Sequence, residues 1–253
     1  MIERLFPSRL RWQWLILGAF WLWGIVMISQ HEPWRDELQS WLLARDSHTV
    51  GELWQNTRYE GHPLTWYAIL FLITRGTHDP FYLQLTHIFL ATFGVYLLVR
   101  FSPFGWWEKF LLSFSYFLGY EYSILSRNYV LGVVGLFGLL SLWPRREKYP
   151  VWFGLILVFL ANTSIYGVIF TLVSCVVVVT EYIQNRRTLN LGHFLAVGMV
   201  ILGIGFSVWQ MQPPVDSGFV VGWTTVYKKE HLEATLATVF RSFIPLPEFG
   251  VHF

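Results

Sequence analysis

One polar stretch in an otherwise apolar sequence holds most of the side chains that could do chemistry. Residues 31–37 read His-Glu-Pro-Trp-Arg-Asp-Glu, and residues 59–67 read Tyr-Glu-Gly-His-Pro-Leu-Thr-Trp-Tyr. These segments collect carboxylates, imidazoles, guanidinium groups and aromatic rings, which exchange protons and bind charged or polar ligands. A loop of about thirty residues is longer than the roughly 12–15 residues of ordinary connections, so this stretch indicates a functional site.

The composition places the chain in a membrane. Of its 253 residues, 54% are hydrophobic and 13% are charged, and the mean hydropathy is +0.45. Soluble domains carry about 25% charged residues, and the repeated apolar runs of about 15–20 residues are typical of membrane spans. A net charge of +2 is too small to indicate nucleic-acid binding, and the single cysteine, Cys175, excludes a disulfide framework or a cysteine metal site.

The positive residues predict the orientation of the chain. Those before the first span place the N-terminus in the cytoplasm and the polar stretch outside. The apolar segment 62–74 is about 20 Å long as a helix, too short for a core of about 30 Å, so we expect it to lie in the outer interface. The first outer loop then covers residues 30–80. The positive residues assigned to the cytoplasm are Arg4, Arg9, Arg11, Arg100, Lys109, Arg145, Arg146, Lys148, Arg186 and Arg187.

The predicted fold class is an all-α membrane protein with about seven transmembrane helices. The apolar stretches 110–143 and 150–183 are too long for one crossing, so we expect breaks within 119–128 and at 162–164. A transmembrane module over 1–211 would precede an outer segment over 212–253. The expected spans are 12–29, 81–99, 109–125, 129–143, 151–162, 165–183 and 191–210.

Two short surface helices are predicted in the first outer loop. Over 36–46, apolar and long side chains recur at helical spacing and give one face for the membrane or the protein, namely Leu38, Trp41, Leu42 and Arg45. Over 49–58, Thr49 and Glu52 have the spacing of a capping box. These helices would hold Asp36 at the mouth of the membrane domain.

The polar groups of the predicted outer face also have ordinary structural interpretations. Asp36, with Gln39 three residues on, fits an N-cap, and Arg127 fits a side chain snorkelling from a helix end. His62 would cap the helix that follows it, and Glu121 would pair with Arg127. These interpretations leave the clustering on one side unexplained, because ionisable groups at membrane depth cost about 2.5–3.5 kcal/mol each and usually mark function.

The order of these motifs resembles the integral-membrane glycosyltransferases of the GT-C type, in the branch with protein mannosyltransferases and aminoarabinose transferases. Leu64 stands where that family often has a second proline, and family members are commonly about twice this length. We therefore expect the chain to be the N-terminal, truncated half of such an enzyme. The matching motifs are Asp36-Glu37, His62-Pro63-Leu64 with Tyr67, and Glu121 with Ser126-Arg127-Asn128-Tyr129; Thr163 to Tyr166 is a fainter match.

The resemblance implies transfer of a sugar from a polyprenyl-phosphate donor to a lipid, glycan or protein acceptor. Asp36 would be the catalytic base, with Glu37 assisting it. Arg127 would stabilise the leaving phosphate, with Arg58 or Arg35 in reserve. The remaining substrate-binding candidates are His62, Tyr67, Glu121 and Tyr129; Trp34, Trp66 and Tyr67 would either stack on the sugar or mark the membrane interface.

The same resemblance implies a bacterial cytoplasmic membrane protein, with its active site facing outward among membrane lipids. No cofactor is certain, although some relatives use a divalent metal, for which Asp36 and Glu121 are the acids that we would pair. The alternative is a non-catalytic membrane protein, such as a transporter or flippase-like module or a degenerate scaffold. Transporters place ionisable groups near the bilayer midplane, whereas this sequence collects them at one surface.

Overall fold

The computed structural model describes residues 9–216, 229 and 232–233. The chain divides into one unit over Met1–Val215 and a second over Asp216–Phe253. In the second unit, Lys229 and Glu233 form an exposed ion pair of 3.5 Å. Residues 217–228, 230–231 and 234–253 of the predicted outer segment, Lys228 and Glu230 among them, lie outside the described residues.

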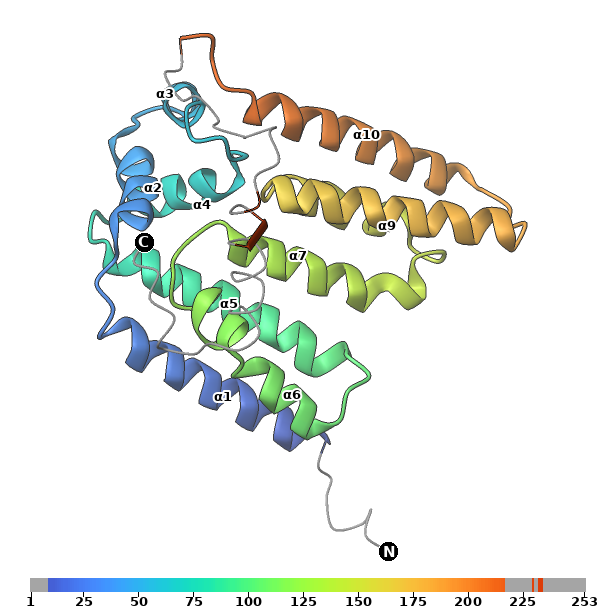
Figure 1. Ribbon diagram of the computed structural model, residues 1–253, viewed down its shortest axis with the longest axis horizontal. Helices are drawn as coiled ribbons and strands as arrows, with labels where there is room; N and C mark the ends of the chain where they lie inside the picture. Colours follow the sequence, from blue (N-terminus) through green and yellow to red (C-terminus); the bar gives the residue numbers. More distant parts are fainter. Residues whose placement is uncertain (1–8, 217–228, 230–231, 234–253) are drawn as a thin grey trace, which may run out of the picture. The chain divides into compact units, whose positions relative to one another are not determined.

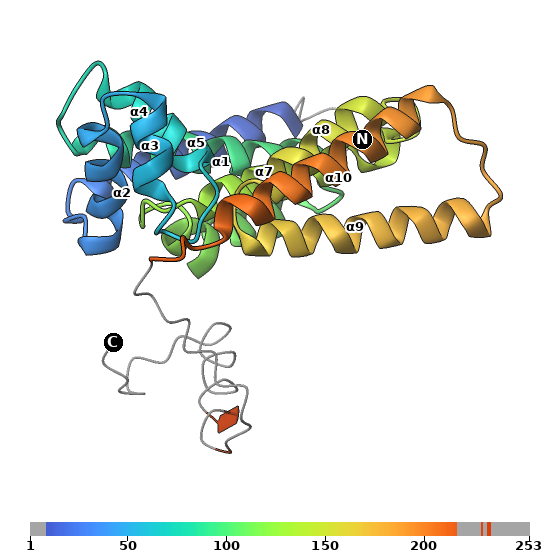
Figure 2. The ribbon, with the colours of Figure 1, turned by 90° about the horizontal axis from the view of Figure 1, so that it is seen from above.

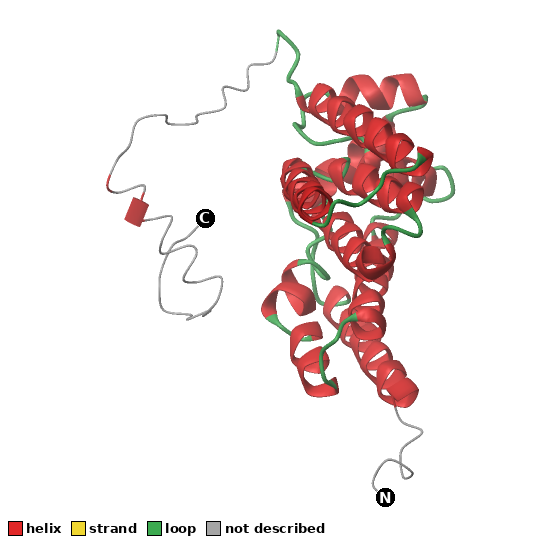
Figure 3. Ribbon diagram, turned by 90° about the vertical axis from the view of Figure 1, so that its right-hand side faces the viewer, coloured by secondary structure: helices red, strands yellow, loops and turns green. Residues whose placement is uncertain are grey.

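The regular elements of the described residues are all helical (Figure 3), which confirms the all-α prediction. Three of the helices, α5, α9 and α10, are long and apolar enough to cross a membrane. Shorter apolar segments cover 12–28, 65–74, 129–145 and 150–161. The elements are α1 Arg9–Ile28, α2 Arg35–Asp46, α3 Val50–Thr57, α4 Thr65–Thr74, α5 Phe81–Phe101, α6 Trp106–Ser113, the π-helical turn η2 Phe117–Glu121, α7 Tyr129–Leu142, the 3₁₀ turn η3 Trp143–Arg145, α8 Pro150–Ala161, α9 Ile165–Gln184 and α10 Leu191–Met211.

The longer helices of the first unit lie side by side, with the short helices α2, α3 and α4 gathered at one end of them (Figures 1 and 2). Helix α5 packs between α1 and α7, and α8 packs against α7, α9 and α10. Glycine permits the close approach of α7 to α8, because a Cβ on Gly135 would lie 3.1 Å from a methyl carbon of Leu160. A small residue at this position therefore allows the two helices to pack closely.

The two predicted surface helices are present at nearly their predicted bounds. At α3, the Thr49 side chain accepts a hydrogen bond from the Glu52 amide at 3.1 Å, which confirms the predicted cap. On the predicted face of α2, Trp41 is fully buried and Leu42 is 39% exposed. The buried side chains of α2 are Glu37, Ser40, Trp41 and Ala44. Glu37 is buried because its carboxylate finds hydrogen-bond partners in the interior of the protein.

The predicted span over 109–125 is interrupted in the structure. Helix α6 ends at Ser113 and is about 12 Å long, and the π-helical turn η2 follows after a break. The carbonyl of Gly119 in this turn accepts a hydrogen bond from the indole of Trp23 at 2.8 Å. A side chain at Gly119 would press on the Phe114 backbone, so the turn is compact where the chain changes direction.

The predicted break at 162–164 is confirmed and is held by polar contacts. Helix α8 ends before Asn162, and the side chain of Ser164 caps α9 by accepting a hydrogen bond from the Gly167 amide at 3.2 Å. The Gln210 amide near the end of α10 donates to the Asn162 side chain at 3.0 Å. The Gln210 side-chain oxygen accepts from the Leu64 amide at 2.9 Å, so α10 ties this break to the loop before α4.

The tight turn between α8 and α9 gives a test of the fold. A Cβ on Gly167 would clash with the Leu160 carbonyl and lie 2.6 Å from the Thr163 hydroxyl, whereas a Cβ on Gly205 would meet nothing within 4 Å. We expect Gly167→Ala to lower the free energy of unfolding by about 1–3 kcal/mol, as overpacking does. Gly205→Ala is the matched control in α10. Thermal unfolding of both variants in detergent checks this, and equal unfolding temperatures would contradict the described turn.

Candidate functional site

Glu37 is a fully buried carboxylate that joins two distant segments. Its Oε1 accepts a hydrogen bond from the Ser126 amide at 2.6 Å, across 89 positions of the sequence. Its Oε2 accepts from the Trp34 amide at 3.0 Å and lies 2.9 Å from Nε2 of His31. The side chain is 0% exposed. Glu37 therefore caps α2 and fixes it to the segment before α7, and Asp36 does not serve as the N-cap.

The sequence neighbours of Glu37 and Ser126 form an ion pair. Asp36 precedes Glu37, Arg127 follows Ser126, and the Arg127 guanidinium lies 3.1 Å from the Asp36 carboxylate. The Asp36 side chain is 45% exposed and that of Arg127 is 28% exposed, so both remain open to a ligand. The structure therefore brings together two predicted site residues that lie far apart in the sequence. Arg127 does not snorkel away from the protein.

Two further side chains hold the backbone around Arg127. The ring of His87, on α5, is buried with Nδ1 3.0 Å from the Ser123 carbonyl and Nε2 3.2 Å from the Arg127 carbonyl. The side-chain amide of Asn128 donates to the Thr163 carbonyl at 2.8 Å. His87 lies in an apolar run with no motif around it, so the sequence offered no signal for this role.

A polar pocket of about 150 Å³ opens beside the ion pair. It draws residues from α2, from the loop before α4, from α4 itself and from the segment before α7. The residues that line it are Asp36, Gln39, Ser40, Glu60, His62, Trp66, Tyr67, Arg127 and Asn128. Four of the predicted site residues therefore meet in one pocket, namely Asp36, His62, Tyr67 and Arg127.

Two buried nitrogen atoms of the pocket residues have no hydrogen-bond partner among the described residues. They are Nδ1 of His62 and Nε1 of Trp66. Buried polar atoms are nearly always paired, and an unpaired one costs about 1–3 kcal/mol. Both residues line the pocket. His62 does not cap α4, which begins at Thr65 without a side-chain cap.

Burial controls the protonation of the pocket residues. It lowers the pKa of His62, and the nearby Arg127 guanidinium lowers it further, so the imidazole is neutral at pH 7. Burial and the Glu60 carboxylate raise the pKa of Tyr67, whose hydroxyl donates to Glu60 at 3.3 Å. The Gln39 side chain donates to the other Glu60 oxygen at 2.7 Å. Glu60 stands in the polar segment 59–67, but its position in the sequence predicts no role for it.

Tyr129 lies at the edge of this group. The Arg127 guanidinium carbon is 5.4 Å from the centre of the Tyr129 ring, and the His62 ring meets it edge-on at 6.3 Å. Trp66 and Tyr67 are 1% and 2% exposed, so neither belongs to an aromatic belt, whereas Trp34 is 50% exposed.

Two predicted substrate-binding residues are not brought to the pocket. Glu121 accepts a hydrogen bond from the Tyr116 hydroxyl at 3.0 Å and does not pair with Arg127 in the described contacts. Arg58 ends α3 on the surface and does not line the pocket. Both residues are near the motifs in sequence, but helix ends direct them elsewhere.

The side chains of the pocket do not form a metal site. The described residues contain no group of three or more His, Cys, Asp or Glu side chains that could hold a metal ion. Asp36 pairs with Arg127, and Glu121, its suggested partner, pairs with Tyr116. The side chains of the pocket therefore do not fit the divalent metal that the resemblance suggested, and we assign no chemical step to a metal ion.

Because the Glu37 carboxylate is buried and hydrogen-bonded, we expect its removal to lower the stability of the protein strongly. Glu37→Ala leaves the Ser126 and Trp34 amides without their acceptor, at about 1–3 kcal/mol for each buried donor. Glu37→Gln keeps one acceptor oxygen and should lose less. Glu32→Ala, an exposed glutamate in the same loop, is the control. Thermal unfolding in detergent measures the unfolding temperatures of the three variants. A Glu37→Ala variant as stable as Glu32→Ala would show that Glu37 does not fix α2 to the segment before α7.

Comparison of the chain with family models, with curated proteins and with solved structures finds no match. The chemistry of the site therefore rests on the side chains described above. These are the paired charges of Asp36 and Arg127, the neutral imidazole of His62 and the unpaired indole nitrogen of Trp66.

Proposed function

We propose that the chain is a membrane glycosyltransferase of the GT-C type, which transfers a sugar from a polyprenyl-phosphate donor to an acceptor hydroxyl. The observation that supports this most is the convergence of Asp36 and Arg127 on a polar pocket beside His62. A carboxylate and a guanidinium are the two groups that such a transfer requires, one for the acceptor proton and one for the leaving phosphate.

The membrane placement belongs to the same proposal. Helices α1, α5, α7, α8, α9 and α10 cross a bacterial cytoplasmic membrane, and α6 with η2 makes the seventh crossing. The N-terminus is cytoplasmic because positive residues precede α1. The pocket then faces the outside, where α2, α3 and α4 cover the ends of the crossing helices.

The proposed transfer balances as a single displacement at the anomeric carbon. The acceptor oxygen forms the new bond from the face opposite the phosphate, which inverts the configuration. The bond from the anomeric carbon to the phosphate oxygen breaks, and its electron pair leaves with the polyprenyl phosphate. Asp36 takes the acceptor proton, and Arg127 stabilises the charge that gathers on the phosphate.

The resting ion pair explains how one pocket serves both groups. While Arg127 pairs with Asp36, the guanidinium and the carboxylate are engaged with each other. A donor phosphate competes for the guanidinium and releases Asp36 for the acceptor. The pocket of about 150 Å³ is smaller than the roughly 300–1,000 Å³ of small-molecule sites, so it would hold the reacting groups while the prenyl tail lies in lipid.

Asp36→Asn tests the base. The amide keeps the size of the side chain and removes the proton acceptor, so we expect sugar transfer to fall by about 10²–10⁴-fold at unchanged membrane abundance. Asp46→Asn is the matched control, since Asp46 is exposed and pairs with its neighbour Arg45. The assay measures transfer from a radiolabelled polyprenyl-phosphate sugar in membranes. Full activity of Asp36→Asn would remove this residue from the mechanism and favour the non-catalytic alternative.

Arg127→Ala tests the phosphate contact. We expect kcat/KM for the donor to fall by about 10²–10³-fold, with a smaller effect on the KM for the acceptor. Arg127→Lys restores the charge without the bidentate geometry and should recover only part of the loss. Arg45→Ala is the control for a surface arginine. Equal losses for donor and acceptor would assign Arg127 a structural role instead.

A further inference from the structure

Two loops at the far end of the helices from the candidate site form a basic surface. The loop 143–149 joins α7 to α8, and the loop 185–190 joins α9 to α10. Helix α9 begins next to Thr163, whose carbonyl binds Asn128 at the pocket, and it has 20 residues. About 30 Å of helix therefore separates the second loop from the candidate site. The cations of the basic surface are Arg145, Arg146, Lys148, Arg186 and Arg187.

Two ion pairs hold the loops of the basic surface together. The Arg146 guanidinium pairs with Glu181 at the end of α9, and Arg187 pairs with Glu147 of the first loop. Each pair joins the segment before α8 to the segment around the end of α9, so the two loops stay adjacent. These pairs use both acidic residues of the sequence between 142 and 190.

Three cations of the basic surface are left without an acidic partner. Arg145, Lys148 and Arg186 are exposed and form no ion pair among the described residues. Five cations and two carboxylates leave the surface with a net charge of +3. Arg186 has a φ of 48°, in the left-handed region that favours glycine or asparagine, so its charge is placed there at a cost to the backbone.

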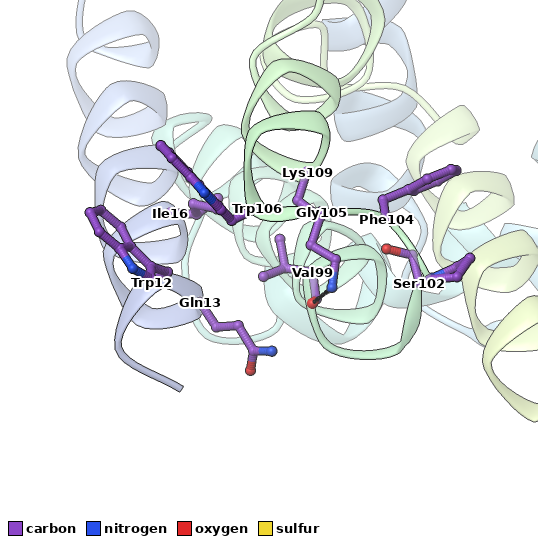
Figure 4. A pocket seen from close by; sticks show the side chains of 10 residues that line it. Trp12, Gln13, Ile16, Val99, Ser102, Phe104, Gly105, Trp106 and Lys109 are labelled. Atoms are coloured by element: carbon purple, nitrogen blue, oxygen red, sulfur yellow. Dashed lines mark hydrogen bonds between the residues drawn. The ribbon is translucent and has the colours of Figure 1, made fainter. Parts of the chain in front are cut away.

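Exposed tryptophans at the same end of the helices are typical of the level of lipid headgroups. Figure 4 shows Trp12 and Trp106 beside a cavity of about 640 Å³ between the first turns of α1, the end of α5 and the start of α6. These rings stack at 5.1 Å, Trp106 stacks on Trp107 at 4.6 Å, and the three are 38%, 47% and 57% exposed. A Cβ on Gly138, near the end of α7, would lie 4.0 Å from Leu97, near the end of α5. The ends of α5 and α7 are therefore at the same level, and the basic surface begins there.

We propose that the basic surface binds the phosphate headgroups of anionic phospholipids, in the membrane leaflet opposite the candidate site. Guanidinium groups bind phosphate oxygens through charge-assisted hydrogen bonds. A lipid is favoured over a soluble anion because the surface adjoins apolar side chains: Ile183 and Leu191, on either side of the second loop, are 72% and 73% exposed. The inference rests on the proposed membrane placement and not on sugar transfer, so its failure would leave the Asp36→Asn test unaffected.

Native mass spectrometry of the detergent-solubilised full chain tests the proposal. Phosphatidylglycerol and phosphatidylcholine with the same acyl chains are titrated separately. We expect phosphatidylglycerol to bind at least about tenfold more tightly, since each cation near an anionic headgroup contributes about fivefold. The double variant Arg145→Gln/Arg186→Asn should lower the affinity for phosphatidylglycerol about tenfold and leave that for phosphatidylcholine unchanged. Asparagine suits the left-handed conformation at 186, so this variant keeps the loop.

A matched control removes two cations at the other end of the helices. Arg35→Gln/Arg58→Gln replaces two exposed arginines that form no ion pair among the described residues, and it should leave phosphatidylglycerol binding unchanged. Glu147→Gln should act in the opposite direction, because it frees Arg187 from its ion pair and should raise the affinity about fivefold.

Three results would overturn the proposal. The first is equal binding of the two lipids by the unmodified chain. The second is an unchanged affinity for phosphatidylglycerol in both Arg145→Gln/Arg186→Asn and Glu147→Gln. The third is displacement of the lipid by glycerol phosphate at equal concentration, because it would show a site for soluble anions.

Discussion

The site depends on one buried carboxylate. Glu37 binds the amide of Ser126, and the residues next to these two in the chain, Asp36 and Arg127, form the ion pair of the pocket. Functional groups keep their geometry when neighbouring hydrogen bonds fix their backbone. Glu37 is thus a positioning residue. His87 adds to this control by facing the carbonyl of Arg127.

The two cavities of the first unit differ in the chemistry of their walls. The pocket at Asp36 is lined mainly by polar groups, among them the neutral imidazole of His62. The cavity between α1, α5 and α6 is lined mainly by apolar and aromatic side chains.

Local sequence signals predicted the positions of the helices and breaks better than they predicted the contacts between them. The break at 162–164, the two surface helices and the Thr49 cap follow from hydrophobic periodicity and capping residues, which act within one turn. The burial of Glu37 could not be predicted in this way, because its partner Ser126 lies 89 positions away. The interruption after α6 and the pairing of Glu121 with Tyr116 were missed for a different reason, since each depends on a local turn that apolar composition does not reveal.

The bond from Leu64 to Gln210 has a consequence for biosynthesis. These residues are 146 positions apart, and Gln210 lies in the last turn of α10. Contacts of such high sequence separation form late, because the intervening chain must first be ordered. The loop that carries His62 is therefore completed only when α10 has left the ribosome and joined the other helices.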